Sequence, residues 1–278
     1  MTKLGIVIWG MMMASGQQRP LVSTALLEGQ LGSRNMVVLH VGTEKDYAEG
    51  HIPGARLVHL GDVGITDAHG LRLQLPSVEA LQKTFGAVGV SDQSRIVVYA
   101  GNPTVQAATR VWFTLDYLGL AERSSLLDGG LAAWRSEGRA VSTEAPAVAA
   151  TSFSVRVRPE VVVTADWLHS KLVDPALVLI DTRTEEFYSG KSAGMMPRAG
   201  RIPGARNVPF SSVFGADNKF KSKEELRRMM GEKPIVVYCH IGLQATVVYF
   251  VARYLGLEAR LFDGSFQEWS GRKDLPVQ

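Results

Sequence analysis

Short apolar runs alternate with longer, partly apolar stretches in the first part of the chain. Residues 37–41, 96–99 and 126–127 are short and apolar, a pattern typical of buried strands. Residues 77–85 and 105–118 lie between these runs and are typical of helices. Because strands that alternate with helices are joined by right-handed crossovers, the pattern predicts an α/β fold, with a mainly parallel sheet and helices on both faces.

The same pattern occurs a second time. Matching segments are residues 51–56 (HIPGAR) and 201–206 (RIPGAR), 95–99 (RIVVY) and 234–238 (PIVVY), 117–120 and 254–257 (both YLGL), and 128–134 (DGGLAAW) and 263–269 (DGSFQEW). A repeat of more than about 100 residues indicates duplicated domains rather than stacked solenoid units.

A segment without helical periodicity separates the two copies. Residues 136–157 are rich in Ala, Ser, Glu and Arg and contain Pro146. We therefore predict a first domain at residues 20–140, a linker at 141–160 and a second domain at 161–278.

The second copy contains Cys239, the only cysteine in 278 residues. It follows the apolar run 235–238 and precedes the apolar segment 246–255, which Gly256 ends. A cysteine between a strand and a helix N-terminus faces unpaired backbone N–H groups and the positive end of the helix dipole, which favour the thiolate. The alternative is a buried cysteine that only packs in the core.

The residues around Cys239 resemble the active loop of the rhodanese (sulfurtransferase) family. The loop comprises Cys239, His240, Ile241, Gly242, Leu243, Gln244 and Ala245. Residues 263–269, 181–183 and 201–207 resemble three further family signatures, so the likeness covers nearly all of residues 161–278. It implies two tandem rhodanese-like domains, the first degenerate and the second catalytic.

The resemblance implies a sulfurtransferase that moves sulfane sulfur from a small anionic donor such as thiosulfate to cyanide or a thiol. Cys239 would form a persulfide in a two-step reaction, and the loop amides would stabilise the anionic sulfur. No metal or organic cofactor is expected. The alternatives are a 3-mercaptopyruvate sulfurtransferase, or a sulfur carrier or protein-binding module that serves a protein acceptor. A cysteine-dependent phosphatase is disfavoured, since position 245 is Ala rather than a phosphate-binding Arg.

Five further residues are candidates for substrate binding or for support of the loop. His240 is either a cationic or hydrogen-bonding group beside the donor or a solvent-facing residue. We expect Asp181 and Arg183 to support the loop as an ion pair. The mercaptopyruvate branch of the family has a carboxylate-binding Arg where this chain has Phe187. Lys191 and Arg198 lie in a segment that the first copy lacks, and either could supply the missing cation; the alternative is that both are solvated loop charges.

The first copy lacks the residues that this chemistry needs. Ala100 stands opposite Cys239, His40 opposite Asp181 and Gly42 opposite Arg183. Its loop is two residues longer (Ala100 to Tyr117 against Cys239 to Tyr254) and contains Pro103. We therefore expect a non-catalytic partner domain.

Composition and the N-terminus limit the remaining classes of protein. A hydrophobic content of 46% and a charged content of 21% are those of a globular protein, and a net charge of +3 gives no case for nucleic-acid binding. Residues 1–16 resemble a secretory signal peptide, too short for stable membrane insertion; the alternative is an uncleaved disordered or apolar tail. The pattern favours export to the periplasm over the cytoplasm.

Overall fold

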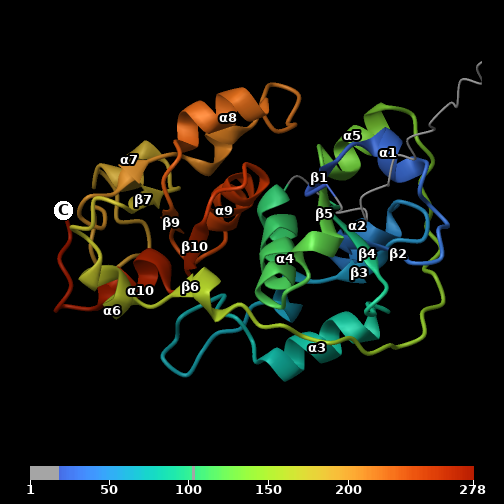
Figure 1. Cartoon of the computed structure of the whole chain (residues 1–278), viewed down its shortest axis with the longest axis horizontal. Helices are drawn as coiled ribbons and strands as arrows, with labels where there is room; N and C mark the ends of the chain where they lie inside the picture. Colours follow the sequence, from blue (N-terminus) through green and yellow to red (C-terminus); the bar gives the residue numbers. More distant parts are fainter. Residues whose placement is uncertain (1–18, 102–103) are drawn as a thin grey trace, which may run out of the picture.

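The computed structural model describes residues 19–101 and 104–278 (Figure 1). The expected signal peptide at residues 1–16 and Pro103 lie outside the described residues.

The first half forms a five-stranded sheet in which every paired neighbour is parallel. In sheet order, its strands are β1 (Leu21–Val22), β5 (Ser124–Leu127), β4 (Arg95–Ala100), β2 (Met36–Val41) and β3 (Arg56–Val58). Its α-helices are α1 (Thr24–Glu28), α2 (Glu44–Ala48), α3 (Val78–Ala87), α4 (Val105–Tyr117) and α5 (Gly130–Ser136). The predicted parallel α/β architecture is confirmed.

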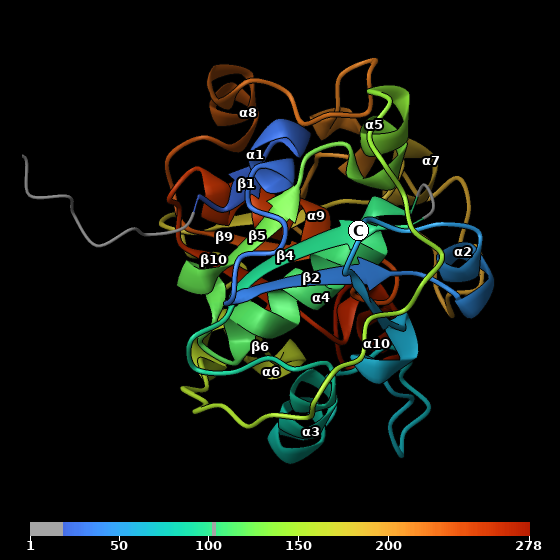
Figure 2. The same ribbon diagram turned by 90° about the vertical axis from the view of Figure 1, so that its right-hand side faces the viewer.

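Both faces of this sheet are buried. In β4, Ile96 and Val98 join the core that includes α3 and α4, whereas Val97 packs on the opposite face with Leu131 and Trp134 of α5. Figure 2 shows β5, β4 and β2 side by side, with α4 behind them. Burial on both faces explains why these strands are continuous apolar runs rather than alternating ones.

The second half repeats the sheet. In sheet order, its strands are β6 (Val162–Val163), β10 (Ala259–Phe262), β9 (Ile235–Tyr238), β7 (Val178–Asp181) and β8 (Arg206–Asn207). Its α-helices are α6 (Ala165–Ser170), α7 (Glu185–Tyr188), α8 (Lys223–Met230), α9 (Ala245–Tyr254) and α10 (Ser265–Gly271). The two halves therefore have the same strand order, and all paired strands of the second sheet are parallel as well.

Helices α4 and α9 pack against each other between the two sheets (Figure 1). Trp112 contacts Phe250, and Phe113 contacts Tyr249, each pair edge to face with ring centroids 4.9 Å apart. One continuous hydrophobic core consequently runs through both halves.

One loop of the first half reaches the second half. We call residues 63–76, between β3 and α3, the crossing loop; in Figure 1 it extends toward α10. No helix among the described residues is long and apolar enough to cross a membrane.

Candidate active site

Cys239 directly follows β9 at the carboxyl edge of the second sheet, and α9 begins at Ala245. Its side chain is only 1% exposed. The position agrees with the rule that sites of parallel α/β sheets lie where the strands end.

The loop between Cys239 and α9 presents unbonded backbone donors. Within the described residues, the N–H groups of residues 240–245 have no hydrogen-bond acceptor. Gln244 precedes the helix without a side-chain cap, so the donors at this helix start are not satisfied locally. Such a set of amides is suited to an anion.

The closing motif of the second half fixes the backbone of this loop. Cys239 N–H donates to Ser265 Oγ at 3.3 Å, while Cys239 C=O accepts from Phe266 N–H at 3.0 Å. His240 C=O accepts from Gln267 N–H at 2.9 Å. Ser265 itself has φ +52°, a conformation that non-glycine residues rarely adopt.

Asp181 and Arg183 form a buried pair beside the loop. Arg183 is 1% exposed and donates to both carboxylate oxygens of Asp181, with Nη2 at 2.6 Å from Oδ2, and to Gly200 C=O at 2.7 Å. Its guanidinium also stacks 4.1 Å from the ring centroid of Phe266. These contacts occupy Arg183 inside the protein.

His240 is half-buried and packs against Phe187, with ring centroids 4.5 Å apart and planes at 89°. Burial lowers the pKa of His240 below its ordinary value, and the positive charge of Arg183 acts in the same direction. Both effects disfavour the imidazolium, which favours a hydrogen-bonding role for His240 over a cationic one.

An arginine of the first half supports the loop from the opposite side. Arg110 of α4 is fully buried; it pairs with the carboxylate of Asp263 and donates to Gly242 C=O at 3.4 Å. Gly242 has φ +81°, and a Cβ at this position would lie 2.9 Å from Asp263 O. The loop therefore requires glycine here for both conformation and space.

A cavity of about 360 Å³ opens over the sulfur. It is lined by Arg72, Phe187, Gly194, Met195, Met196, Cys239, His240, Ile241, Leu243 and Gln244. Gly242 and Ala245 are buried and do not line it. Lys191 is exposed outside the lining, and Arg198 donates to four backbone carbonyls near the C-terminus, those of Trp269, Ser270, Arg272 and Leu275.

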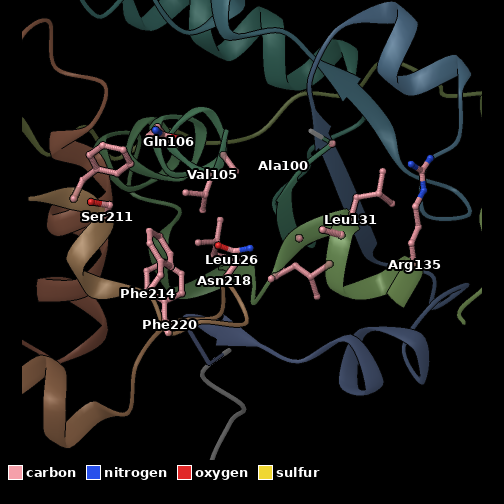
Figure 3. Close-up of a pocket in the computed structure, with 18 residues that line it drawn as sticks. Ala100, Val105, Gln106, Leu126, Leu131, Arg135, Ser211, Phe214, Asn218 and Phe220 are labelled. Atoms are coloured by element: carbon pink, nitrogen blue, oxygen red, sulfur yellow. The ribbon is translucent and has the colours of Figure 1, made fainter. Parts of the chain in front are cut away.

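The equivalent edge of the first sheet has a different cavity, of about 510 Å³ (Figure 3). Ala100 lies there in place of the cysteine, and Phe214 and Phe220 of the second half close it. His40 hydrogen-bonds through Nδ1 to the Tyr99 hydroxyl at 2.9 Å, where the second half has its Asp181–Arg183 pair. The described residues of this edge include neither a thiol nor a charged pair that corresponds to Asp181 and Arg183.

The fold and the site together define a duplicated α/β protein with a buried cysteine at the carboxyl edge of its second sheet. The family model described as "Rhodanese-like domain" matches residues 23–137 and 164–272. The chain belongs to this family, which confirms the resemblance and the two tandem rhodanese-like domains.

Relatives cover most of the chain. It is 29% identical over 266 residues to a thiosulfate sulfurtransferase of Azotobacter vinelandii, covering 92% of this chain and 96% of that protein. It is 32% identical to a probable 3-mercaptopyruvate sulfurtransferase of Pseudomonas aeruginosa (83% and 85% covered) and 31% identical to the sulfur carrier protein TtuD of Thermus thermophilus (92% and 95% covered). These relatives support a transferase, as predicted.

A solved structure shares the fold at lower identity. The anaerobic ergothioneine biosynthesis enzyme from Chlorobium limicola matches with a TM-score of 0.81 and 22% identity, covering 94% of this chain and 70% of that one. At this identity the likeness shows the fold alone.

Sequence reasoning did not identify Arg72 and Arg110 as parts of the site. Both belong to the first half, which lacks the cysteine, and both reach the second half through contacts distant in sequence. The sequence around Arg72 gives no indication that this residue belongs to the site. Arg110 carries a weak signal, because a charged residue stands among apolar residues in the middle of a core helix.

Proposed function

We propose that the chain is a sulfurtransferase that takes sulfane sulfur from thiosulfate on Cys239 and passes it to cyanide or a thiol. The observation that supports this best is the buried Cys239 beside the unbonded N–H groups of residues 240–245. We assign catalysis to residues 161–278 and a non-catalytic role to residues 20–140, joined by a linker at 141–160.

In the first step, the Cys239 thiolate attacks the outer sulfur of thiosulfate. The S–S bond of the donor breaks, a new S–S bond forms on Cys239, and sulfite leaves with the electron pair. In the second step, the acceptor attacks the outer persulfide sulfur and restores the thiolate, giving thiocyanate when the acceptor is cyanide. Atoms and charge balance in both steps without a cofactor.

The neighbouring residues have distinct proposed roles. The amides of the loop from His240 to Ala245 stabilise the anionic sulfur, as an oxyanion hole stabilises oxygen. Asp181 and Arg183 hold the loop rather than the substrate, since each is occupied by the other in the interior. The hydrogen bonds of Arg198 to backbone carbonyls favour a structural role for this residue. Lys191 is exposed and stays a candidate only for attracting the anionic donor from solvent.

The test is the intact mass of the protein after incubation with thiosulfate. We expect the native chain to gain one sulfur, and the Cys239→Ser variant, nearly isosteric but far less acidic, to gain none. Because the chain has no other thiol, sulfur transfer by the serine variant would overturn the mechanism.

A sulfur carrier is the second candidate, supported by the 31% identity to the Thermus thermophilus carrier protein. A carrier would also gain sulfur on Cys239, so mass alone does not separate the two functions. Repeated turnover with thiosulfate and cyanide supports the enzyme, whereas one sulfur per chain and no thiocyanate supports the carrier.

A further inference from the structure

The cavity over Cys239 includes one residue from the first half, Arg72 of the crossing loop. Among the described residues that line the cavity, Arg72 alone carries a permanent charge. Its side chain is exposed, and its guanidinium forms no hydrogen bond or ion pair with any described residue. A cation that has no partner among the described residues and lines the cavity over the sulfur is suited to an anionic ligand.

The second half holds the backbone of the crossing loop firmly in this place. The side-chain amide of Gln267 bonds both backbone groups of Arg72: Oε1 accepts from the N–H at 3.1 Å, and Nε2 donates to the C=O at 2.8 Å. Asp263 Oδ2 accepts from Leu75 N–H at 3.0 Å, and Asp263 O accepts from Gln74 Nε2 at 3.3 Å. The contacts fix the position of Arg72 while leaving its guanidinium free.

Backbone strain next to Arg72 points in the same direction. Leu73 has φ +61°, which a leucine rarely adopts, and its C=O accepts from Arg110 Nη2 at 2.7 Å. Arg110 also pairs with Asp263 and contacts Gly242 of the cysteine loop. One buried arginine therefore couples the strained turn beside Arg72 to the loop that carries the sulfur.

The other cations of the region are already engaged or lie elsewhere. Arg183 is paired with Asp181, Arg198 is surrounded by backbone carbonyls, and Lys191 does not line the cavity. Burial lowers the pKa of His240 and so disfavours its charged form. A reaction between a thiolate and a dianion nevertheless brings like charges together, and the loop amides supply only partial positive charge.

We propose that Arg72 binds the anionic end of the sulfur donor and so determines which donors the enzyme accepts. This inference rests on the proposed function. Arg72 holds the sulfonate oxygens of thiosulfate while the outer sulfur faces Cys239, and it stays with the leaving sulfite. The catalytic half thereby obtains its substrate-binding cation from the half that has no cysteine.

Two-step kinetics allow a direct test, because kcat/KM for the donor reports only the donor step and kcat/KM for the acceptor only the second step. We expect Arg72→Ala to lower kcat/KM for thiosulfate about ten- to a hundredfold, the loss of charge-assisted hydrogen bonds. With dithiothreitol as a neutral acceptor, kcat/KM for the acceptor should not change. Arg72→Lys should restore part of the donor step, and sulfite should inhibit Arg72→Ala more weakly than the native enzyme.

Lys233→Ala is the matched control, since Lys233 is an exposed cation of the second half that precedes β9, at the opposite end of the strand from Cys239. It should leave both steps unchanged. Native kinetics in Arg72→Ala, an equal loss in both steps, or the same donor-step loss in Lys233→Ala would overturn the role of Arg72. If native protein gains no sulfur from thiosulfate, the proposed function fails as well; a sulfur gain with an unaffected Arg72→Ala variant overturns this inference alone.

Discussion

Thr109 Oγ1 lies 2.8 Å from Thr246 Oγ1, and the two threonines occupy equivalent positions in the two halves. Each lies eight residues before the tyrosine of the repeated YLGL segment, Tyr117 in one half and Tyr254 in the other. By the same alignment, Trp112 is equivalent to Tyr249, and Phe113 is equivalent to Phe250. Exchanging the two helices therefore turns the ring pair Trp112–Phe250 into the ring pair Phe113–Tyr249. Helices α4 and α9 thus pack around a local two-fold axis, as in a homodimer whose two chains have been joined.

The next position breaks this symmetry. Arg110 follows Thr109, whereas Val247 follows Thr246. Arg110 pairs with Asp263 of the second half. The equivalent Asp128 accepts a hydrogen bond from Phe220 N–H at 3.0 Å and has no ion-pair partner among the described residues, and burial raises its pKa. The buried cation lies on the side that supports Cys239.

We predict that Arg110→Met destabilises the protein by about 3–5 kcal/mol, because it leaves the buried Asp263 carboxylate without its partner. Sulfur transfer should fall in addition, since Gly242 and Leu73 lose a shared donor. Denaturant unfolding and steady-state kinetics measure the two effects. Adding Asp263→Asn should recover much of the stability but not the activity; simple additivity of the two free-energy changes would contradict the pairing.

A second prediction concerns the bend of the cysteine loop. Gly242→Ala and Gly256→Ala both place alanine at a positive φ, +81° and +80°, which costs about 1–2 kcal/mol in each case. Only at position 242 does the new Cβ meet a neighbour, Asp263 O at 2.9 Å; at 256 nothing lies within 4 Å. We expect the larger loss of unfolding free energy in Gly242→Ala, with donor kcat/KM reduced about a hundredfold in this variant alone. Equal activity in the two variants would show that the loop tolerates the shift.

The third prediction is a pH dependence of stability that originates in the first half. Burial lowers the pKa of His40 to about 4 from 6.5, and the neighbouring His51 acts in the same direction. His40 binds a proton more tightly in the unfolded chain than in the folded protein. The stability that neutral His40 contributes is therefore fully present above pH 6.5 and is lost as the pH falls toward 4. Lowering the pH from 7 to 5 should reduce the free energy of unfolding by about 2 kcal/mol through His40.

The measurement is the free energy of unfolding of the native protein and of His40→Gln at both pH values. The glutamine variant should lose less stability on acidification, whatever its stability at pH 7. The exposed His69→Gln variant is the control and should behave like the native protein. The same pH dependence in His40→Gln would exclude His40 as the source.

Local patterns in the sequence were sufficient for the architecture. The mainly apolar runs at 37–41 and 96–99 lie in strands β2 and β4, because parallel strands buried on both faces are largely apolar. The run at 126–127 is only half of β5, which begins at Ser124. Ser124 and Ser125 are fully buried because their hydroxyls donate to the backbone carbonyls of Leu120 and Arg19, respectively. A pattern of apolar residues does not reveal such hydrogen bonds.

The candidate site could be predicted only as far as its motifs are contiguous. The loop after Cys239 and the Asp181–Arg183 pair are short segments whose geometry follows from a strand end and a helix start. Arg72 and Arg110 depend instead on how two domains pack, which is decided by contacts such as that of Gln267 with the crossing loop. Nothing in the sequence of the crossing loop itself indicates that the loop packs on the second half.

The last prediction concerns the choice of donor. Thiosulfate presents a compact anionic end that loop amides and a single arginine can hold, whereas 3-mercaptopyruvate presents a planar carboxylate best held by a bidentate arginine. Phe187 occupies the position where the mercaptopyruvate branch has that arginine, and its ring packs on His240. We therefore expect kcat/KM for thiosulfate to exceed that for 3-mercaptopyruvate.

Phe187→Arg should narrow this gap by about one to two powers of ten, the equivalent of 1.5–3 kcal/mol of charge-assisted hydrogen bonding to the carboxylate. Phe187→Leu is the matched control, because it removes the ring from His240 without adding a cation and should leave the ratio of the two donors unchanged. Steady-state kinetics with both donors and cyanide decide the matter. A native preference for 3-mercaptopyruvate would show that a cation already present holds the carboxylate. In that case Arg72→Ala should reduce the 3-mercaptopyruvate rate more than the thiosulfate rate, since a carboxylate uses both arms of the guanidinium.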